Sequence, residues 1–136
     1  MSRLTDKEKA SIKQAKSILE YYQEQKRRYE LIREDFEDLC SKGEASRTLQ
    51  TDVRSAIKFI ASVEKAIDSI PNHTGGTWTD KTKAKAQLIL KNKYCHGVRN
   101  MGREYYEQKA NLQPSQYSRV LQVGLLIFAD EYKENS

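Results

Sequence analysis

The stretch ANLQPSQYSRVLQVGLLIFADEY, residues 110–132, decides how the C-terminal part of this chain folds. Asn111 tolerates the left-handed backbone conformation that a tight turn demands. Pro114 fits best in the first turn of a helix, where its missing N–H group costs nothing. The sequence therefore predicts a break over residues 111–113, followed by a helix that Gln113 caps and Pro114 opens.

The apolar residues around this break indicate a helix-turn-helix. A short helix is expected over residues 101–110, and the second helix continues to about Lys133. Apolar side chains fall where two such helices bury residues between them, at Tyr106, Ala110, Leu112, Tyr117 and Val120. Gly124 lies inside the second helix at a cost of about 1 kcal/mol relative to Ala, which the close approach of another helix would explain.

The polar residues at the start of the second helix are suited to reading DNA. Those outside the expected buried face are Ser115, Gln116, Ser118, Arg119 and Gln122, and none of them is acidic. Gln pairs with adenine and Arg with guanine in the major groove. We predict these five residues as base contacts; an ordinary helix hairpin with a solvated polar face is the alternative.

Charge is distributed unevenly along the chain. The net charge is +5, from 24 Lys and Arg against 19 Asp and Glu. Residues 81–119 alone carry nine basic and two acidic side chains, a balance of +7. A basic segment around a helix-turn-helix pattern is typical of phosphate binding. The alternative is a lysine-rich surface that serves only solubility.

Two long helices are expected in the N-terminal half. Thr5 and Glu8 have the spacing of a capping box, and no Gly or Pro intervenes before about Cys40. Gly43 is suited to ending this helix. Over residues 46–69 and just beyond, apolar residues form a heptad seam at Leu49, Val53, Ala56, Ile60, Val63, Ile67 and Ile70. The second helix can fold back on the first as an antiparallel hairpin or pair with a second chain.

We predict an all-α protein with an N-terminal helical hairpin over residues 1–71, a linker over 72–78 and a three-helix domain over 79–136. The first helix of that domain would run from about Thr79 to Tyr94. The linker contains two adjacent glycines, but no Gly-Lys-Ser/Thr follows them, so it is not a phosphate-binding loop. His73 is expected as an exposed loop residue.

Composition excludes several classes of protein. No apolar run approaches the roughly 18 residues of a membrane span, and the first residues lack the apolar core of a signal peptide, so we expect action in the cytoplasm, away from membranes. Cys40, Cys95, His73 and His96 lack the spacing of a zinc site, so no metal or other cofactor is expected. The titratable residues form no catalytic set, and we expect no enzyme.

Three segments resemble one family of regulators. They are Lys93-Tyr94, the turn Ala-Asn-Leu-Gln-Pro-Ser-Gln-Tyr at 110–117, and Gly-Leu-Leu-Ile-Phe-Ala-Asp-Glu-Tyr at 124–132. Together they look like the C-terminal end of the ArpU-like phage transcriptional regulators, small proteins of Gram-positive phages whose tail resembles region 4 of sigma factors. Residues 66–71 are similar to the family's helix that ends in Leu-Pro.

The resemblance implies a phage-encoded, sequence-specific activator of late genes that binds double-stranded DNA in the bacterial host cell. In that picture phosphates are contacted by Lys93, Arg99, Arg103 and Lys109. The N-terminal helices would supply homodimerisation or a contact to RNA polymerase. The alternative is a helical adaptor that binds RNA polymerase or another host protein and keeps the helix-turn-helix only as a fold.

Overall fold

A computed structural model describes residues 4–95, 108 and 111–135. The α-helices of the described residues are α1 (Asp6–Ser41), α2 (Arg47–Asp68), α3 (Asp80–Leu90) and α5 (Pro114–Asn135). A 3₁₀ turn, η1 (Ile70–Asn72), follows α2, and a π-helical turn, η2 (Lys91–Cys95), extends α3. The described residues contain no strand, so the all-α prediction is confirmed. The expected helix over 101–110 falls almost entirely outside the described residues.

The ends of the N-terminal helices follow from local sequence. The hydroxyl of Thr5 accepts from the Glu8 amide at 3.1 Å, and the Glu8 carboxylate accepts from the Thr5 amide at 2.9 Å, which completes the predicted capping box. Gly43 has a φ of +69°, a left-handed conformation that Gly adopts without strain. Ser46 caps α2 by accepting from the Leu49 amide at 3.1 Å.

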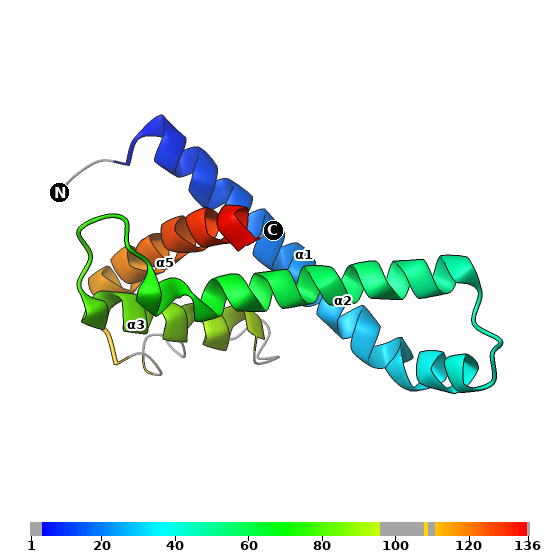
Figure 1. Ribbon diagram of the computed structural model, residues 1–136. Helices are drawn as coiled ribbons and strands as arrows, with labels where there is room; N and C mark the ends of the chain where they lie inside the picture. The colour runs from blue at the N-terminus through cyan, green and yellow to red at the C-terminus, as the bar shows by residue number, and fades with distance from the viewer. Residues whose placement is uncertain (1–3, 96–107, 109–110, 136) are drawn as a thin grey trace.

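Helices α1 and α2 pack against each other within one chain (Figure 1). The rings of Tyr21 and Phe59 lie 5.1 Å apart, and the Tyr22 hydroxyl donates to the Glu64 carboxylate at 2.9 Å. In Figure 1 the far end of this pair, with the connection at residues 42–46, extends to the right, away from α3 and α5. The buried residues of α1 lie in its N-terminal half, while Tyr29 of the other half is partly buried against the core.

Helix α5 is the centre of the core, since it contacts α1, α2 and α3. Its buried face includes Phe128 and Ile127, both fully buried, and the core continues into Leu19 and Tyr22 of α1 and Ile67 of α2. One hydrophobic cluster thus joins residues on both sides of segment 72–78. Burial of apolar area of this kind is the main force that holds helices together.

Segment 72–78 contacts the C-terminal part of α5 through His73 and Glu131. A ring nitrogen of His73, Nδ1, lies 2.9 Å from a carboxylate oxygen of Glu131, and the side chains are only 10% and 12% exposed. The Lys83 ammonium donates to the His73 carbonyl at 3.0 Å, and the Trp78 ring lies 6.1 Å from the His73 ring. The expectation of an exposed His73 was wrong, because a residue 58 positions later covers it.

Candidate nucleic-acid interface

The turn before α5 forms as its residue types predict. Asn111 has a φ of +54°, and its amide donates to the Gln108 carbonyl at 3.1 Å. The Gln113 carbonyl accepts from the Tyr117 amide at 2.9 Å, the first hydrogen bond of the helix. The Gln113 amide is satisfied by the side-chain oxygen of Gln116 at 3.2 Å. The side-chain oxygen of Gln116 therefore accepts a hydrogen bond at the start of α5, and its side-chain nitrogen can donate to another partner.

The N-terminal half of α5 separates its residues into two faces. Tyr117 and Val120 are buried, at 3% and 8% exposure. Four of the five residues predicted as base contacts are exposed and the other is half-buried: exposed are Ser115, Gln116, Arg119 and Gln122, and half-buried is Ser118. The five thus lie together along the open side of one helix, and their contact with bases stays a prediction.

A hollow of about 250 Å³ lies beside this face, between α5 and α3. Lys81 and Lys85 of α3 line it together with Gln116 and Arg119 of α5, and Leu112 and Val120 supply apolar surface. None of the ion pairs formed by the described residues involves Lys81, Lys85 or Arg119, while the nearby Asp80 pairs with Lys83 at 3.5 Å. Three cations therefore converge on a hollow that no carboxylate of the described residues lines.

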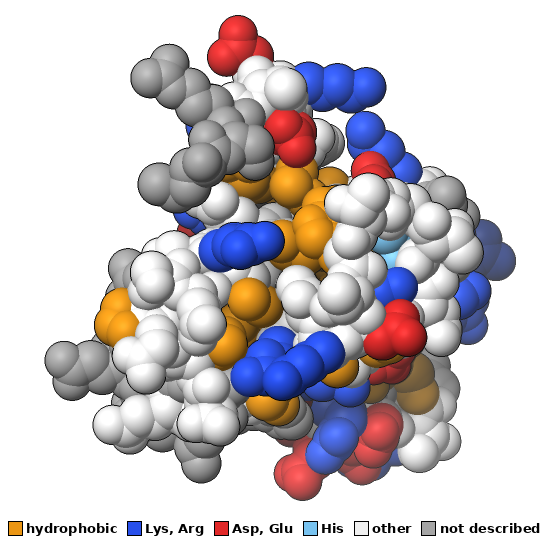
Figure 2. Space-filling view, turned by 90° about the vertical axis from the view of Figure 1, so that its left-hand side faces the viewer, with side chains coloured by type: hydrophobic (Ala, Val, Ile, Leu, Met, Phe, Trp, Pro, Cys, Tyr) orange, Lys and Arg blue, Asp and Glu red, His pale blue; other side chains and the backbone are white. Residues whose placement is uncertain are grey.

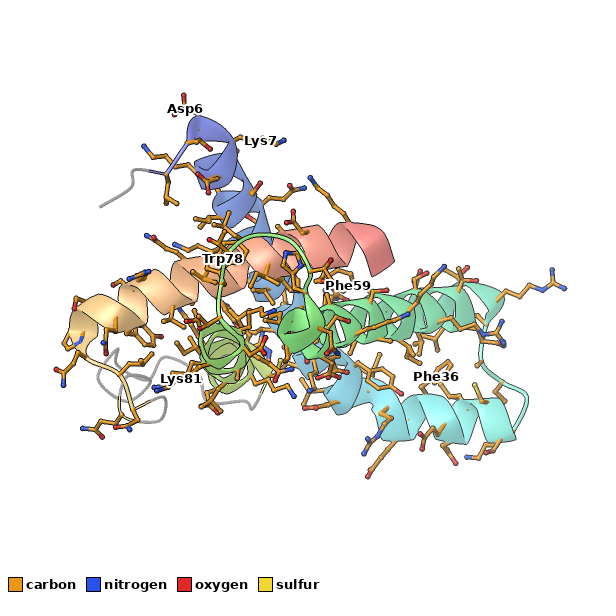
Figure 3. All side chains as sticks on the ribbon, turned by 60° about the vertical axis from the view of Figure 1, so that its left-hand side comes forward. Asp6, Lys7, Phe36, Phe59, Trp78 and Lys81 are labelled. Carbon is orange, nitrogen blue, oxygen red and sulfur yellow. The ribbon has the colours of Figure 1, made fainter. Side chains whose placement is uncertain are left out.

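Figures 2 and 3 show the side of the molecule on which the N-terminal end of α5 lies. In Figure 3 Lys81 extends from α3 on the side of the N-terminal end of α5. Figure 2 views the molecule from the direction in which that end of α5 points. In this view Lys and Arg side chains lie around uncharged and hydrophobic surface, and acidic side chains lie toward the edges. Lys and Arg side chains beside the uncharged middle of this view would attract a polyanion.

A second groove, of about 280 Å³, lies on the other side of α5. Its polar lining comes from Lys9 and Lys16 of α1 and from Ser118 and Gln122 of α5. Apolar side chains complete it at Leu4, Ile12, Leu121 and Leu125. The sequence analysis did not select Lys9 or Lys16, since they lie about one hundred positions before α5. The available signal was their spacing, because positions 9, 12 and 16 share one face of a helix with the buried Ile12.

Of the four predicted phosphate contacts, Lys93 is the one that the structure describes. It is half-buried in η2, its ammonium lies 5.5 Å from the centroid of the Tyr94 ring, and its carbonyl accepts from the Gln23 side chain at 3.0 Å. Burial lowers the pKa of Lys93, nearby Lys16 lowers it further, and Glu20 opposes the shift. Arg99, Arg103 and Lys109 lie outside the described residues.

Other polar groups of the described regions serve the fold. Lys26 bridges α1, α2 and η2, since its ammonium lies 3.2 Å from the Tyr22 hydroxyl and 3.4 Å from both the Glu64 carboxylate and the Cys95 carbonyl. Within residues 4–95, 108 and 111–135, no three His, Cys, Asp or Glu side chains form a group that could hold a metal. Over the same ranges no helix has the length and apolar character needed to cross a membrane.

No family model, no curated protein and no solved structure matches this chain.

Proposed function

We propose that this chain is a sequence-specific DNA-binding regulator of transcription that inserts the N-terminal half of α5 into the major groove. The observation that carries the proposal is the exposed polar face of α5 beside the hollow where Lys81, Lys85 and Arg119 converge. The resemblance to phage regulators supports the finer reading, an activator of late genes encoded by a phage or prophage. The proposed role is binding, without catalysis or a cofactor.

The chemistry of the face supports separate roles for its residues. Arg119 can donate two parallel hydrogen bonds to guanine, and the Gln116 amide nitrogen can donate to a base edge while its oxygen caps the helix. Lys81 and Lys85 are flexible cations beside the helix, where the phosphates that border a groove would lie. Phosphate contacts of this kind give affinity for any duplex, and base contacts give preference for one sequence.

The first experiment measures binding of a fluorescent 20-bp duplex by anisotropy over 50–200 mM salt. The variant Lys81→Ala/Lys85→Ala is compared with Lys58→Ala/Lys65→Ala, which removes the same charge from exposed lysines of α2. We expect the first variant to lose affinity for all duplexes about equally. The salt slope, which is the steepness with which log K falls as log salt concentration rises, should decrease by about two, one per lysine. Equal behaviour of the two variants would contradict this interface.

A second experiment identifies the preferred sequence. Selection of bound fragments from a random duplex pool should yield one consensus. A palindromic consensus would indicate a symmetric homodimer, because half-site spacing mirrors protein symmetry. A pool that shows no enrichment would rule out sequence-specific reading.

A protein-binding adaptor is the second candidate, and a specific surface favours it. Large apolar side chains are exposed on the α1–α2 pair, with Tyr21 at 53%, Leu31 at 75%, and Ile32 and Ile57 both at 42%. Three of these four side chains belong to α1, and exposed apolar side chains that form one patch mark protein contacts. RNA polymerase that co-elutes with the wild type but not with a Leu31→Asp variant, together with no DNA retention, would support the adaptor.

A further inference from the structure

The exposed polar face of α5, called the reading face below, consists of Ser115, Gln116, Ser118, Arg119 and Gln122. The N-terminal half of α1 contributes cations to the same side of the molecule. Lys9 and Lys16 line the second groove from α1, and Ser118 and Gln122 line it from α5. Lys9 and Lys16 are exposed, and no ion pair among the described residues involves either one. Their positions, seven apart, place both on one side of α1, because seven residues are close to two helical turns.

The hollow lined by Lys81 and Lys85 and the groove lined by Lys9 and Lys16 lie on opposite sides of the exposed face of α5. Successive residues of a helix are rotated by about 100°, so Gln116 and Ser118 fall at the two edges of this face, with Arg119 and Gln122 between them. Gln116 and Arg119 line the hollow on the α3 side, and Ser118 and Gln122 line the groove on the α1 side. A duplex that contacts all of these residues would therefore cover both hollows.

Lys93 adds a third cation to the α1 side. Its backbone is held to α1 by the hydrogen bond from Gln23, and its ammonium is close enough to Lys16 for the two charges to repel. Glu20 offsets part of that repulsion. Burial is the larger cause of the lowered pKa of Lys93, and the cations that line the groove itself are Lys9 and Lys16.

We propose that the N-terminal half of α1 is a second phosphate-contacting element of the DNA interface. Lys9 and Lys16 would bind backbone phosphates on one side of the groove that α5 occupies, and Lys81 and Lys85 would bind those on the other side. The inference rests on the proposed function and extends it, since α1 was expected only to dimerise or to contact RNA polymerase. The ligand is the phosphodiester backbone of double-stranded DNA, because residues of the reading face line the groove.

The test uses the full chain and the anisotropy assay with a random-sequence duplex. Single variants Lys9→Ala and Lys16→Ala are compared with Lys7→Ala, an equal change of charge on the same helix. Lys7 is two positions from Lys9 and so lies on the far side of α1, where Figure 3 shows it turned away from the N-terminal end of α5. Circular dichroism confirms that each variant is folded.

Lys9→Ala and Lys16→Ala should each reduce the salt slope by about 0.9. For each of them, the factor by which affinity falls between 50 and 200 mM salt should therefore be about threefold smaller than for the wild type. Lys7→Ala should keep the wild-type slope. For the double variant Lys9→Ala/Lys16→Ala, the factor by which affinity falls over the same salt range should be about tenfold smaller than for the wild type. Lys9→Arg/Lys16→Arg should keep the wild-type slope because charge is retained.

Three results would overturn the inference, and they separate it from the proposed function. Wild-type protein that does not bind duplex at 50 mM salt overturns both. If Lys81→Ala/Lys85→Ala weakens binding while Lys9→Ala/Lys16→Ala does not, only the role of α1 is wrong. If the Lys9→Ala/Lys16→Ala variant binds duplex like the wild type but no longer binds a poly-glutamate peptide, the groove belongs to an acidic protein partner.

Discussion

A Cβ atom added to Gly124 of α5 would lie 3.2 Å from the Cβ atom of Ala86 of α3. The expected close approach of another helix at Gly124 is thereby confirmed. Lys81 and Lys85 precede Ala86, and Gln116 and Arg119 precede Gly124, so the residues before the crossing on both helices line one hollow. The missing side chain of Gly124 thus allows α3 to come near enough for its lysines to lie beside Arg119.

Gly124→Leu should destabilise the protein. Leu favours the helix over Gly by about 1 kcal/mol, but its side chain must enter a contact where the nearest atoms are the Cβ and carbonyl oxygen of Ala86 and a methyl group of Leu90. Because four side-chain carbons must be accommodated, overpacking should cost about 3 kcal/mol, the upper end of its usual range, and the net loss should be about 2 kcal/mol. Urea denaturation measures it.

Ala61→Leu is the matched control, because Ala61 is exposed in the middle of α2. Its unfolding free energy should stay within about 0.5 kcal/mol of the wild type. If Gly124→Leu is as stable as this control, α3 and α5 do not depend on their close contact.

Arg119→Ala should reduce sequence preference more than overall affinity for DNA. A bidentate contact from Arg to guanine gives about 1–3 kcal/mol of discrimination, so one position of the selected consensus should become degenerate. Arg54→Ala, on the exposed side of α2, removes the same charge far along the chain and should leave the consensus intact. Competition between matched and mismatched duplexes provides the measurement, and a consensus unchanged by Arg119→Ala would remove Arg119 from the reading face.

Lys93→Met should make the fold more stable at neutral pH while it weakens DNA binding. Burial and the nearby Lys16 lower the pKa of Lys93, which means that its protonated form costs folding free energy. That cost is fully present below the folded-state pKa and disappears as the pH rises from there to the ordinary lysine pKa of the unfolded chain. The stability advantage of the Met variant should therefore shrink as the pH rises, in urea denaturation at pH 7 and at alkaline pH.

In the same Lys93→Met variant, loss of one phosphate contact should reduce the salt slope of DNA binding by about one. A variant that is less stable than the wild type at pH 7 would show that Lys93 is a structural residue, contrary to this prediction.

Glu131→Ala should loosen the segment that joins α2 to α3. The substitution removes the 2.9 Å partner of His73, whose side chain is only 10% exposed, and leaving such a group unsatisfied costs about 1–3 kcal/mol. Glu131→Gln keeps an acceptor oxygen and should lose less. Asp130→Ala is the control, since Asp130 is exposed and lies 4.0 Å from His73. Thermal unfolding that ranks all three variants as equal would refute the anchoring role.

Much of the fold could be read from neighbouring residues. Thr5 with Glu8, Gly43, Asn111 and Pro114 fixed helix ends at the predicted places, because caps and turns depend on backbone groups only a few positions away. The exposed face of α5 was predicted in the same way, from the period of its apolar residues.

The surroundings of that face could not be read from the sequence. His73 was expected to be exposed, yet it pairs with Glu131, and Lys9 and Lys16 were not selected although they line a groove with Ser118 and Gln122. Nothing near these residues in the chain specifies such partners.

For the described residues, the sequence by itself determined that the chain is helical, where α1, α2, α3 and α5 begin, and which side of α5 is apolar. Only the tertiary structure decided that α5 lies against α1, α2 and α3 together, with lysines of α1 and α3 on either side of its exposed face. The physical reason is that helix caps and the spacing of apolar residues act over one or two helical turns. Which helices pack together depends instead on how apolar faces and close contacts, such as Gly124 with Ala86, fit across the whole core.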